Sequence, residues 1–537
     1  MELKNIRKSF GPRKVLLGAS WQLKMGEKVG LVGLNGSGKT TLLRIISGEI
    51  PSDGGQVRVD PDIQMGCVSQ EARFDDSKTL KEEICDQSIM DMCESLKELE
   101  TEIAQLSDDD PRLTELVDRY SRLQTEFQNI DGYMYETRLE MILSRMGFAS
   151  SDLDTPASAL SGGQKSRAQL ARELLKQPDL LLLDEPGSHL DINALEWLEG
   201  FLSSYKGAVL VVSHDRHLLD KVTHKTLELE FGQLRQYSGN YTYYTDQKER
   251  ARVRQHYDYV NQQQEIAHLK EAIESLRSWG VKGNTRKFAR RARSMEKRIE
   301  RIEVVEKPRK KSKMQLNLEF QKRSGEMVVE AVGLSRSFGD QVLFSGVDFH
   351  IRWGEHVAIV GPNGSGKTTL IRTLLGLEPP DNGHVNLGEG LVISYFDQEQ
   401  RGLNENRTIY DELGESTDLT KEATMYLLSK LLFRGDRAFK KIEQLSGGER
   451  NRVVLSKLVY TKANLLVLDE PTNHLDIPSI EVLEDALAAF QGTVILVSHD
   501  RHLLTRVVDR VIELDKGEVR FYTGGYEYYL MKREDIE

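Results

Sequence analysis

A glycine-rich loop that ends in lysine and threonine occurs twice in the chain, as GLNGSGKTT and as GPNGSGKTT. The glycines let the backbone curl so that its N–H groups point at phosphate oxygens, and the helix predicted to follow adds the positive end of its dipole. The lysine is placed to reach the β- and γ-phosphates of a nucleoside triphosphate, and the threonine hydroxyl to bind Mg²⁺. The nucleotide contacts predicted from the two loops are Gly33, Asn35, Gly36, Ser37, Gly38, Lys39, Thr40 and Thr41, and Gly361, Asn363, Gly364, Ser365, Gly366, Lys367, Thr368 and Thr369.

Each loop is followed later in the chain by four apolar residues and then Asp-Glu. This pattern predicts a buried strand that presents two acids at its carboxyl end. The first acid is placed to hold Mg²⁺ with the loop threonine, and the second to polarise the water that attacks the terminal phosphate. The predicted Mg²⁺ ligands are Thr40 and Asp184 in the first half and Thr368 and Asp469 in the second, and the predicted water-activating acids are Glu185 and Glu470.

A histidine follows a strand-like segment and a serine in each half, at His214 and His499. A single histidine in such a place is usually structural. Because this one recurs at the same offset as the acids, we predict that each histidine contacts the γ-phosphate or its attacking water.

These motifs are parts of one internal repeat. The phosphate loops are 328 residues apart, as are Phe10 and Phe338, whereas the LSGG, Asp-Glu and histidine motifs are all 285 residues apart. The halves are therefore collinear, except that the first has 43 more residues between Gln70 and its LSGG sequence. Apolar strands that alternate with amphipathic helices predict the α/β class, with a largely parallel core sheet in each of two tandem nucleotide-binding domains.

The repeat also predicts the domain boundaries. We expect a first nucleotide-binding domain at 1–244, a linker at 245–325 and a second nucleotide-binding domain at 326–537, with a helical hairpin inserted at about 88–130. Two apolar seams with a turn at 107–111 predict that inserted hairpin. The residues of the seams are Leu96, Leu99, Ile103 and Leu106, and Leu113, Leu116, Tyr120, Leu123 and Phe127.

The linker has a charge opposite to that of the whole chain. The net charge is −11, yet the segment from Arg277 to Lys313 holds fifteen Lys/Arg and four Asp/Glu. Heptad-like apolar spacing on both sides of a glycine break at 280–284 predicts a two-helix hairpin. A dense run of arginines on its tip suits a phosphate backbone, although a charge run can also be a solvated helix face. The predicted RNA contacts are Lys282, Arg286, Lys287, Arg290, Arg291 and Arg293.

The composition predicts a protein that neither spans a membrane nor is secreted. No apolar run approaches the roughly 18–20 residues that a membrane span requires, and the N-terminus has no apolar signal segment. Cys67, Cys85 and Cys93 have no metal-site spacing, so we expect free thiols in a reducing cytoplasm.

The order of the motifs, with a phosphate loop, Gln, LSGG[QE], DEP, HLD and SHD, resembles the nucleotide-binding domain of ATP-binding-cassette proteins over nearly the whole chain, twice. The resemblance implies two cassettes packed head to tail within a monomer, with ATP and Mg²⁺ between one cassette's phosphate loop and the other's LSGG sequence. It implies adenine stacking on Phe10 and Phe338, and metal and catalytic roles for Gln70 and Gln398. One implied site pairs Lys39, Gln70, Asp184, Glu185 and His214 with Ser446, Gly447 and Gly448, and the other pairs Lys367, Gln398, Asp469, Glu470 and His499 with Ser161, Gly162 and Gly163. The sequence GSHLD at 187–191 departs from TNHLD at 472–476, which leaves the equivalence of the two sites open.

The long basic linker and a YSGNYTYY motif before it make the chain similar to the ABC-F family of ribosome-associated translation factors. That resemblance implies binding of the 70S ribosome at the tRNA exit (E) site, with the linker contacting peptidyl-tRNA and rRNA and the inserted arm near the L1 stalk. Two alternatives are the fused ATPase subunit of a membrane importer and a DNA-repair or chromosome-type ATPase. The sequence does not distinguish a general translation factor, the rescue of stalled ribosomes and antibiotic resistance; the short turn of the linker favours the first.

Overall fold

The computed structural model describes residues 1–70, 74–106, 110, 112–130, 132–282, 285–301, 314–339, 341–397, 403–415 and 420–535. It divides into two compact units: Met1–Asn240 together with Lys313–Glu537, and Tyr241–Ser312. The division after Asn240 comes four residues before the boundary that we expected, because the last tyrosines of the YSGNYTYY motif already form the first turn of a long helix.

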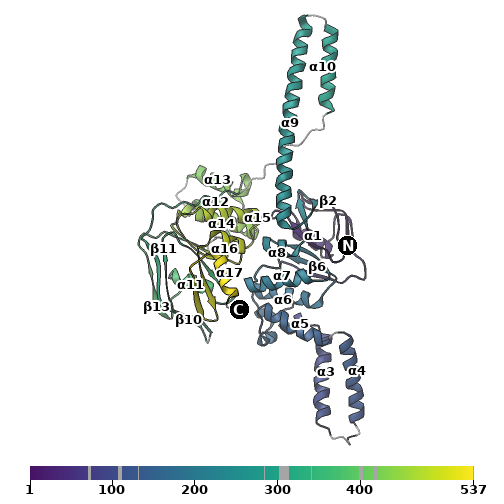
Figure 1. Cartoon of the computed structure of the whole chain (residues 1–537), viewed down its shortest axis with the longest axis vertical. Coiled ribbons are helices and arrows are strands. Elements are labelled where there is room, and N and C mark those ends of the chain that lie inside the picture. The colour runs from purple at the N-terminus through teal and green to yellow at the C-terminus, as the bar shows by residue number, and fades with distance from the viewer. Residues whose placement is uncertain are drawn as a thin grey trace. The chain divides into compact units, whose positions relative to one another are not determined.

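A six-stranded sheet forms the centre of the N-terminal half (Figure 1). Its strands, in the spatial order β5-β6-β7-β3-β8-β9, are β3 (Lys28–Val32), β5 (Met65–Val68), β6 (Leu180–Asp184), β7 (Ala208–Val212), β8 (Lys225–Glu230) and β9 (Gln233–Ser238). All neighbours are parallel except the β8–β9 pair. The central strands β3, β6 and β7 are buried throughout, which is why they read as continuous apolar runs.

The C-terminal half repeats this sheet. Its strands, in the order β14-β15-β16-β12-β17-β18, are β12 (His356–Val360), β14 (Ile393–Phe396), β15 (Leu465–Asp469), β16 (Thr493–Val497), β17 (Arg510–Asp515) and β18 (Glu518–Tyr522). Again only the last pair is antiparallel. The predicted class, α/β with two mostly parallel core sheets, is confirmed.

Each half also has a three-stranded antiparallel sheet. The strands are β1 (Glu2–Phe10), β2 (Arg13–Gln22) and β4 (Gly54–Arg58) in the first half, and β10 (Met327–Phe338), β11 (Gln341–Arg352) and β13 (Asn382–Leu387) in the second. Phe10 and Phe338 are the last residues of β1 and β10, so each aromatic ring is held at the end of a hairpin.

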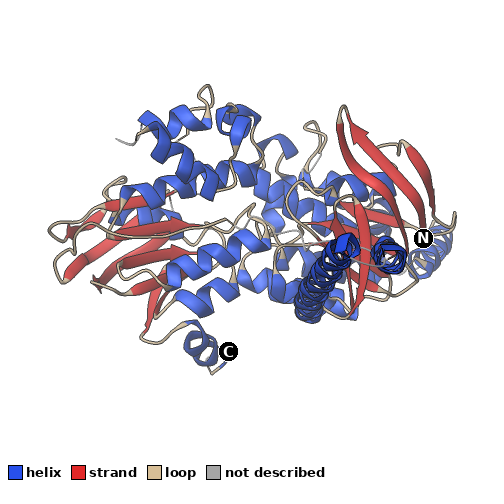
Figure 2. Ribbon diagram, turned by 90° about the horizontal axis from the view of Figure 1, so that it is seen from above, coloured by secondary structure: helices blue, strands red, loops and turns tan. Residues whose placement is uncertain are grey.

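Helices pack against the sheets (Figure 2). The first half has α1 (Lys39–Ile46), α2 (Leu80–Ile84), α5 (Gly132–Arg145), α6 (Gly162–Lys176), α7 (Ile192–Ser204) and α8 (Arg216–Val222), with short 3-10 helices at Ser150–Asp154 and Ala157–Ala159. The second half has α11 (Lys367–Leu374), α12 (Ile409–Glu415), α13 (Lys421–Lys430), α14 (Gly447–Thr461), α15 (Ile477–Ala488), α16 (Arg501–Val507) and α17 (Tyr526–Glu534), with 3-10 helices at Gly435–Phe439 and Ile442–Gln444.

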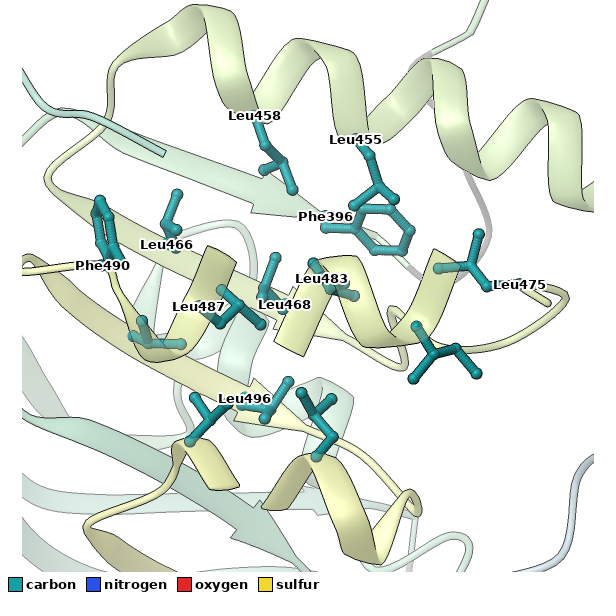
Figure 3. Packing of buried hydrophobic residues seen from close by; sticks show 14 of the residues in the cluster. Phe396, Leu455, Leu458, Leu466, Leu468, Leu475, Leu483, Leu487, Phe490 and Leu496 are labelled. Carbon is teal, nitrogen blue, oxygen red and sulfur yellow. The ribbon is translucent and has the colours of Figure 1, made fainter. Parts of the chain in front are cut away.

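The core of the second half shows how these layers join (Figure 3). Leu455 and Leu458 of α14 point toward the sheet, where Phe396 of β14 and Leu466 of β15 meet them. This packing fixes α14 on one face of the sheet. The N-terminus of α14, where the LSGG sequence lies, is therefore held in a defined place.

The insertion in the first half forms two antiparallel helices, α3 (Gln87–Ala104) and α4 (Leu113–Asn129) (Figure 1). Cys93, Leu96 and Phe127 form a small apolar core between them, and Tyr120 and Leu123 pack against it. Of the predicted turn at 107–111, only residue 110 lies within the described residues; Asp110 pairs with Arg112 at 3.0 Å.

The second unit is also a helical pair, α9 (Tyr241–Lys282) and α10 (Thr285–Glu300). Ile273 of α9 and Ala292 of α10 are buried, and Arg277 pairs with Glu296 at 2.6 Å. We expected the helix to break from Gly280 onward. The start of this break was wrong, because α9 continues through Gly280 to Lys282, and α10 begins at Thr285. The other two positions, 283 and 284, lie outside the described residues.

Within the part of the chain that is described, no helix is both long enough and apolar enough to span a membrane. Cys67, Cys85 and Cys93 are free thiols, and burial raises the pKa of each.

Candidate functional site

The two phosphate loops have the backbone that their glycines predict. Gly38 precedes α1 with a φ of 106° and Gly366 precedes α11 with a φ of 98°, in the left-handed region that favours glycine. A Cβ on Gly33 would come within 2.6 Å of the carbonyl oxygen of Leu229. The loop can therefore lie tightly on the sheet only with glycine at these positions.

The loop lysines lie over their own loops. Nζ of Lys39 donates hydrogen bonds to the carbonyl oxygens of Gly33 at 2.7 Å and Leu34 at 3.3 Å, and Lys367 makes the equivalent bonds at 2.8 and 2.9 Å. Burial lowers the pKa of both lysines, while the neighbouring acids oppose that shift. Each ammonium group is therefore buried and donates to neutral carbonyl oxygens of its own loop, so a bound phosphate would give it an anionic hydrogen-bond partner.

The predicted Mg²⁺ residues come together at the ends of β6 and β15. The hydroxyl of Thr368 donates to Oδ2 of Asp469 at 2.8 Å, and Thr40 makes a side-chain hydrogen bond to Asp184. Burial raises the pKa of both aspartates. The pairing of a hydroxyl with a carboxylate beside a phosphate loop supplies the hard oxygen ligands that Mg²⁺ prefers.

Glu185 and Glu470 follow directly, in a strained backbone conformation with φ of 53° and 50°. Burial raises the pKa of each to about 8. Oε2 of Glu185 accepts a hydrogen bond from the backbone N–H of His214 at 3.1 Å, and Glu470 is bonded in the same way by His499. These bonds aim each carboxylate toward the phosphate loop.

The two histidines are neutral. Burial lowers the pKa of His214 and of His499 to about 3. Nε2 of each ring lies 3.4 Å from Oε1 of the adjacent glutamate, which is too long for a strong hydrogen bond and, with a neutral ring, is no salt bridge. Nδ1 of each ring is free to bond to another group.

The same four kinds of buried polar atom lack a hydrogen-bond partner on both sides. They are Ser37 Oγ, Asp184 Oδ2, Glu185 Oε1 and His214 Nδ1, and Ser365 Oγ, Asp469 Oδ1, Glu470 Oε1 and His499 Nδ1. Buried polar groups are rarely left without a partner unless a ligand or water completes them. This donor set fits a triphosphate with Mg²⁺, because it combines a loop hydroxyl, two acids and an imidazole around a lysine.

Each phosphate loop also touches the opposite half of the protein. The amide group of Asn35 donates to the carbonyl oxygen of His474 at 2.9 Å, and its backbone N–H donates to Asp476 at 3.2 Å. Asn363 makes the equivalent bonds to His189 at 2.8 Å and to Asp191 at 3.1 Å. The two halves therefore face each other head to tail.

The LSGG serines cap helices. Ser161 and Ser446 each accept a hydrogen bond from the third backbone N–H of α6 and α14, within capping boxes completed by Gln164 and Glu449. A Cβ on Gly448 would lie 2.8 Å from the amide nitrogen of Asn35. The N-terminus of α14 and its dipole thus face the first phosphate loop.

A cavity of about 360 Å³ lies at the second phosphate loop. Its walls come from both halves, since Gly187, His189 and Leu190 stand opposite Lys367 and Glu470. Phe338 also lines it and is 56% exposed, with the Arg336 guanidinium 5.2 Å from its ring. Phe10 is 53% exposed beside Lys8, so both rings present a free face.

The two sites differ at the hairpin that follows the aromatic residue. Arg13 donates to the carbonyl oxygen of Gly36 at 2.8 Å, which places a cation on the first phosphate loop. The equivalent position holds Gln341, a neutral side chain that lines the cavity of the second site. The sites therefore share their chemical groups and differ in the charge near the loop.

Sequence reasoning missed several contacts. No motif indicates the bond of Arg13 to the first loop, and the HLD motifs alone do not show that their residues bond the opposite loops. The HLD residues that do so are His189, Asp191, His474 and Asp476. The recurrence of HLD at the 285-residue offset could have indicated their use. Gln70 is exposed, while Gln398 lies outside the described residues. The side chains of Lys282, Arg286 and Lys287 also lie outside the described set, and Arg290, Arg291 and Arg293 are exposed on α10.

Comparison with known proteins agrees with this geometry. The family described as ABC transporter matches residues 16–188 and 344–473, and a second family of that description matches 227–318. The chain is 39% identical to the putative ATP-binding protein YdiF of Bacillus subtilis, over 100% of this chain and 83% of that protein. It is also 39% identical to ABC transporter F family member 5 of Arabidopsis thaliana, over 100% and 78%. The chain belongs to the ABC-F family.

A further ABC-F relative is the energy-dependent translational throttle protein EttA of Escherichia coli, which is 34% identical over 98% of this chain and 92% of its own. The fold is similar to that of an archaeal ribosome recycling factor, aABCE1, solved with the stalk protein aP1, at a TM-score of 0.60 and 21% identity over 99% and 92% of the two chains. The RNase-L inhibitor gives a TM-score of 0.59 at 21% identity over 97% and 90%. This ABC-F protein therefore carries two ATP-binding-cassette ATPase domains, the cassettes, one in each half.

Proposed function

We propose that this ABC-F protein hydrolyses ATP at two composite sites, each formed by the phosphate loop of one cassette and the LSGG sequence of the other. The observation that carries the proposal is the reciprocal bonding of Asn35 to His474 and Asp476, and of Asn363 to His189 and Asp191. Two loops that bond the opposite cassette in the same way are in position to share their ligands with it.

The roles within each site follow from its groups. The loop lysine and the N-terminus of the following helix bind the phosphates, the aromatic ring stacks on adenine, and the opposite LSGG serine and glycines close over the γ-phosphate. Thr40 and Asp184, or Thr368 and Asp469, would hold Mg²⁺ with Gln70 or Gln398. Bound Mg²⁺ would neutralise charge on the phosphate oxygens.

Hydrolysis needs a base for the attacking water. Glu185 and Glu470 are held by backbone bonds and lie beside the loops, so they take this role. The neutral histidines offer Nδ1 to the γ-phosphate or to the water. A hydrogen bond from a neutral ring orients its partner but does not remove a proton. The glutamate therefore takes the proton from the attacking water.

The same arrangement lets ATP act as a switch. The γ-phosphate can contact both cassettes at once, whereas ADP has no group to reach the opposite LSGG serine. ATP therefore binds the closed form more tightly than the open one, and hydrolysis reverses the preference.

We further infer that the closed form acts on translation at the ribosome in the cytoplasm, most simply as a monomer. Two observations favour this target. A relative that matches nearly the whole chain is named a translational throttle, and the unit between the cassettes carries exposed arginines on α10. Arginines bind phosphate backbones through charge and paired hydrogen bonds. The linker would contact tRNA or rRNA at the E site of the 70S ribosome.

The hairpin of α3 and α4 offers a second contact. The sequence between the two helices contains the run SDDDP, whose acids would be repelled by RNA, so a basic ribosomal protein, such as that of the L1 stalk, fits it better. Deletion of 95–125 should then weaken ribosome affinity without loss of ATP hydrolysis. Unchanged affinity would mean that the hairpin has no part in binding.

Co-sedimentation with ribosomes tests the proposal. The double variant Glu185→Gln with Glu470→Gln should close on ATP without hydrolysing it, and should pellet with 70S ribosomes only when ATP is present. The matched control, Lys39→Ala with Lys367→Ala, should not. Partition to membranes in place of ribosomes would favour an importer subunit and contradict the proposed target.

A further inference from the structure

Two buried glutamates occupy equivalent positions in the cassettes, Glu199 in α7 and Glu484 in α15, and the side chain of each is 0% exposed. Each is contacted by two residues of its own cassette. The carboxylate of Glu199 lies 3.0 Å from Nδ1 of His217 and 3.1 Å from Nζ of Lys221. Glu484 is contacted in the same way, by His502 at 3.1 Å and Arg506 at 3.5 Å.

A further partner of each glutamate comes from the opposite cassette. Arg501 of the second cassette bonds to Glu199, and Arg216 of the first bonds to Glu484. These crossing arginines are only 11% and 14% exposed, whereas Arg506 and Lys221 are 43% and 47% exposed. Burial alone would raise the pKa of Glu199, but the hydrogen bond from His217 and the charge of Arg501 outweigh it and lower that pKa to about 2. The glutamate therefore stays charged.

The crossing arginines are close in sequence to the catalytic groups. Arg216 is the first residue of α8 and comes two residues after His214. Asp215 between them caps the helix and accepts bonds from the backbone N–H groups of His217 at 2.8 Å and Leu218 at 3.2 Å. Since the backbone of His214 holds Glu185, a short, rigid path joins Glu484 of one cassette to the catalytic base of the other.

The path is repeated in the opposite direction. Asp500 caps α16 in the same way. Arg501 comes two residues after His499, whose backbone N–H bonds Glu470. The helix that presents Glu199 to Arg501 begins just after Asp191, which bonds the second phosphate loop through Asn363. Ile192, the first residue of that helix, belongs to the apolar core of the second cassette. Both ends of the contact thus belong to one packed surface.

We propose that Arg216 and Arg501 are positioning residues that align the glutamate–histidine pair of their own cassette only when the opposite cassette presents its buried glutamate. The inference rests on the proposed composite ATPase sites. Without the crossing bond, α8 or α16 loses its anchor, and the catalytic glutamate loses its orientation. When the crossing bonds form, each site can hydrolyse ATP. When the two cassettes are apart, a cassette that has bound ATP does not hydrolyse it.

Matched variants of the full-length protein separate this role from simple packing. Arg216→Gln removes the crossing contact to Glu484, and Arg506→Gln removes the same-cassette contact to the same carboxylate. Arg501→Gln and Lys221→Gln form the corresponding pair at Glu199. For each variant we would measure kcat and KM for ATP, the affinity for ADP, and the thermal unfolding temperature.

Because each arginine aligns only the site of its own cassette, loss of alignment predicts that the double variant Arg216→Gln with Arg501→Gln lowers kcat about tenfold, whereas each single variant lowers it by about half. The affinity for ADP should stay within about twofold of wild type. The matched double variant Arg506→Gln with Lys221→Gln should change kcat by less than about twofold, because neither contact crosses between the cassettes. Arg216→Lys should recover part of the loss, and Arg216→Gln with Glu484→Gln should be no worse than the poorer single variant.

Equal kcat values for the double crossing variant and the double same-cassette variant would overturn the inference, provided that wild type hydrolyses ATP. Wild-type protein without ATP hydrolysis would instead overturn the proposed function. Should Arg216→Gln fail to fold, Arg216→Lys carries the test, because it keeps the charge and loses only the geometry of the guanidinium. A wild-type kcat in that variant, with Arg501→Lys equally active, would also count against positioning.

Discussion

At the scale of single residues, Glu185 and Glu470 combine a strained backbone with burial. Non-glycine residues adopt such φ values at a cost, and the conformation persists where the surroundings impose it. The backbone N–H groups of His214 and His499 supply that constraint by bonding the carboxylates. These bonds therefore hold each catalytic glutamate in place before any nucleotide binds.

The raised pKa of these glutamates predicts a pH dependence of hydrolysis. A base works only when ionised, and a carboxyl group whose pKa is about 8 in the nucleotide-free protein is mostly protonated at pH 6 to 7. Since kcat/KM reports the free enzyme, we expect it to rise about tenfold from pH 6 to pH 7 and to level off above pH 8 at saturating Mg²⁺.

Steady-state hydrolysis across this pH range checks the prediction. Residual activity of the variant Glu185→Gln with Glu470→Gln should lack the rise, because glutamine does not titrate. A profile that is flat from pH 6 to 8 in wild type would show that the glutamates are already ionised before ATP binds.

Asn35 and Asn363 provide a second residue-scale prediction. Each side chain donates one hydrogen bond to the opposite cassette, so alanine at either position should weaken closure by about 1 kcal/mol and raise the KM for ATP roughly fivefold. ADP affinity should hardly change, because ADP binding does not need closure. Asn386→Ala is the control, since Asn386 bonds Glu330 on an antiparallel sheet of its own cassette. Equal losses of ATP and ADP affinity would place these asparagines in nucleotide binding alone.

At the scale of elements, the sequence could predict those strands and turns that depend on local sequence patterns. The apolar runs that became β6 and β15 end in acids, and the glycines before α1 and α11 allow the left-handed turns. The bonds of Arg216 and Arg501 could not be predicted, because their partners lie far away in sequence and no local pattern marks them. Gly280 stayed helical because α9 packs along α10, and that packing outweighs its weak helix propensity.

The hairpin of α3 and α4 depends on one large side chain. Phe127 is buried against Cys93 and Leu96, and its ring meets Tyr133 edge to face at 5.0 Å. Phe127→Ala should destabilise the hairpin by about 3 to 5 kcal/mol, seen as faster hydrogen exchange in both helices, while ATP hydrolysis stays near wild type. Val117→Ala, at an exposed position of α4, should change neither. Exchange that stays slow in Phe127→Ala would mean that other contacts hold the hairpin together.

The basic helix α10 predicts a dependence on salt. If Arg290, Arg291 and Arg293 each neutralise a phosphate, replacing all three by glutamine should weaken ribosome binding and flatten its salt dependence, by a slope of roughly 0.7 to 0.9 for each lost contact. Binding measured between about 50 and 200 mM salt checks this. Lys270→Gln, an exposed lysine on α9 outside the cluster, should leave the slope nearly unchanged. An unaltered slope in the triple variant would exclude these arginines from RNA contact.

At the scale of the whole molecule, the two cassettes have the same chemical groups at their phosphate loops, and each contributes groups to the opposite site. The paired contacts of Asn35 and Asn363 lie at the nucleotide sites, and those of Arg216 and Arg501 join α8 to α15 and α16 to α7. Closure of one site without the other would break half of these contacts. We therefore expect the two sites to close together, while Arg13 and Gln341 give them different affinities for the nucleotide.

The most direct measurement is an experimental structure of Glu185→Gln with Glu470→Gln bound to ATP and Mg²⁺. We predict two nucleotides, one between Lys39 and the Ser446–Gly448 segment and one between Lys367 and the Ser161–Gly163 segment. Each γ-phosphate should contact both cassettes. Nucleotides bound to the phosphate loops alone, with Ser161 and Ser446 facing solvent, would contradict the composite sites.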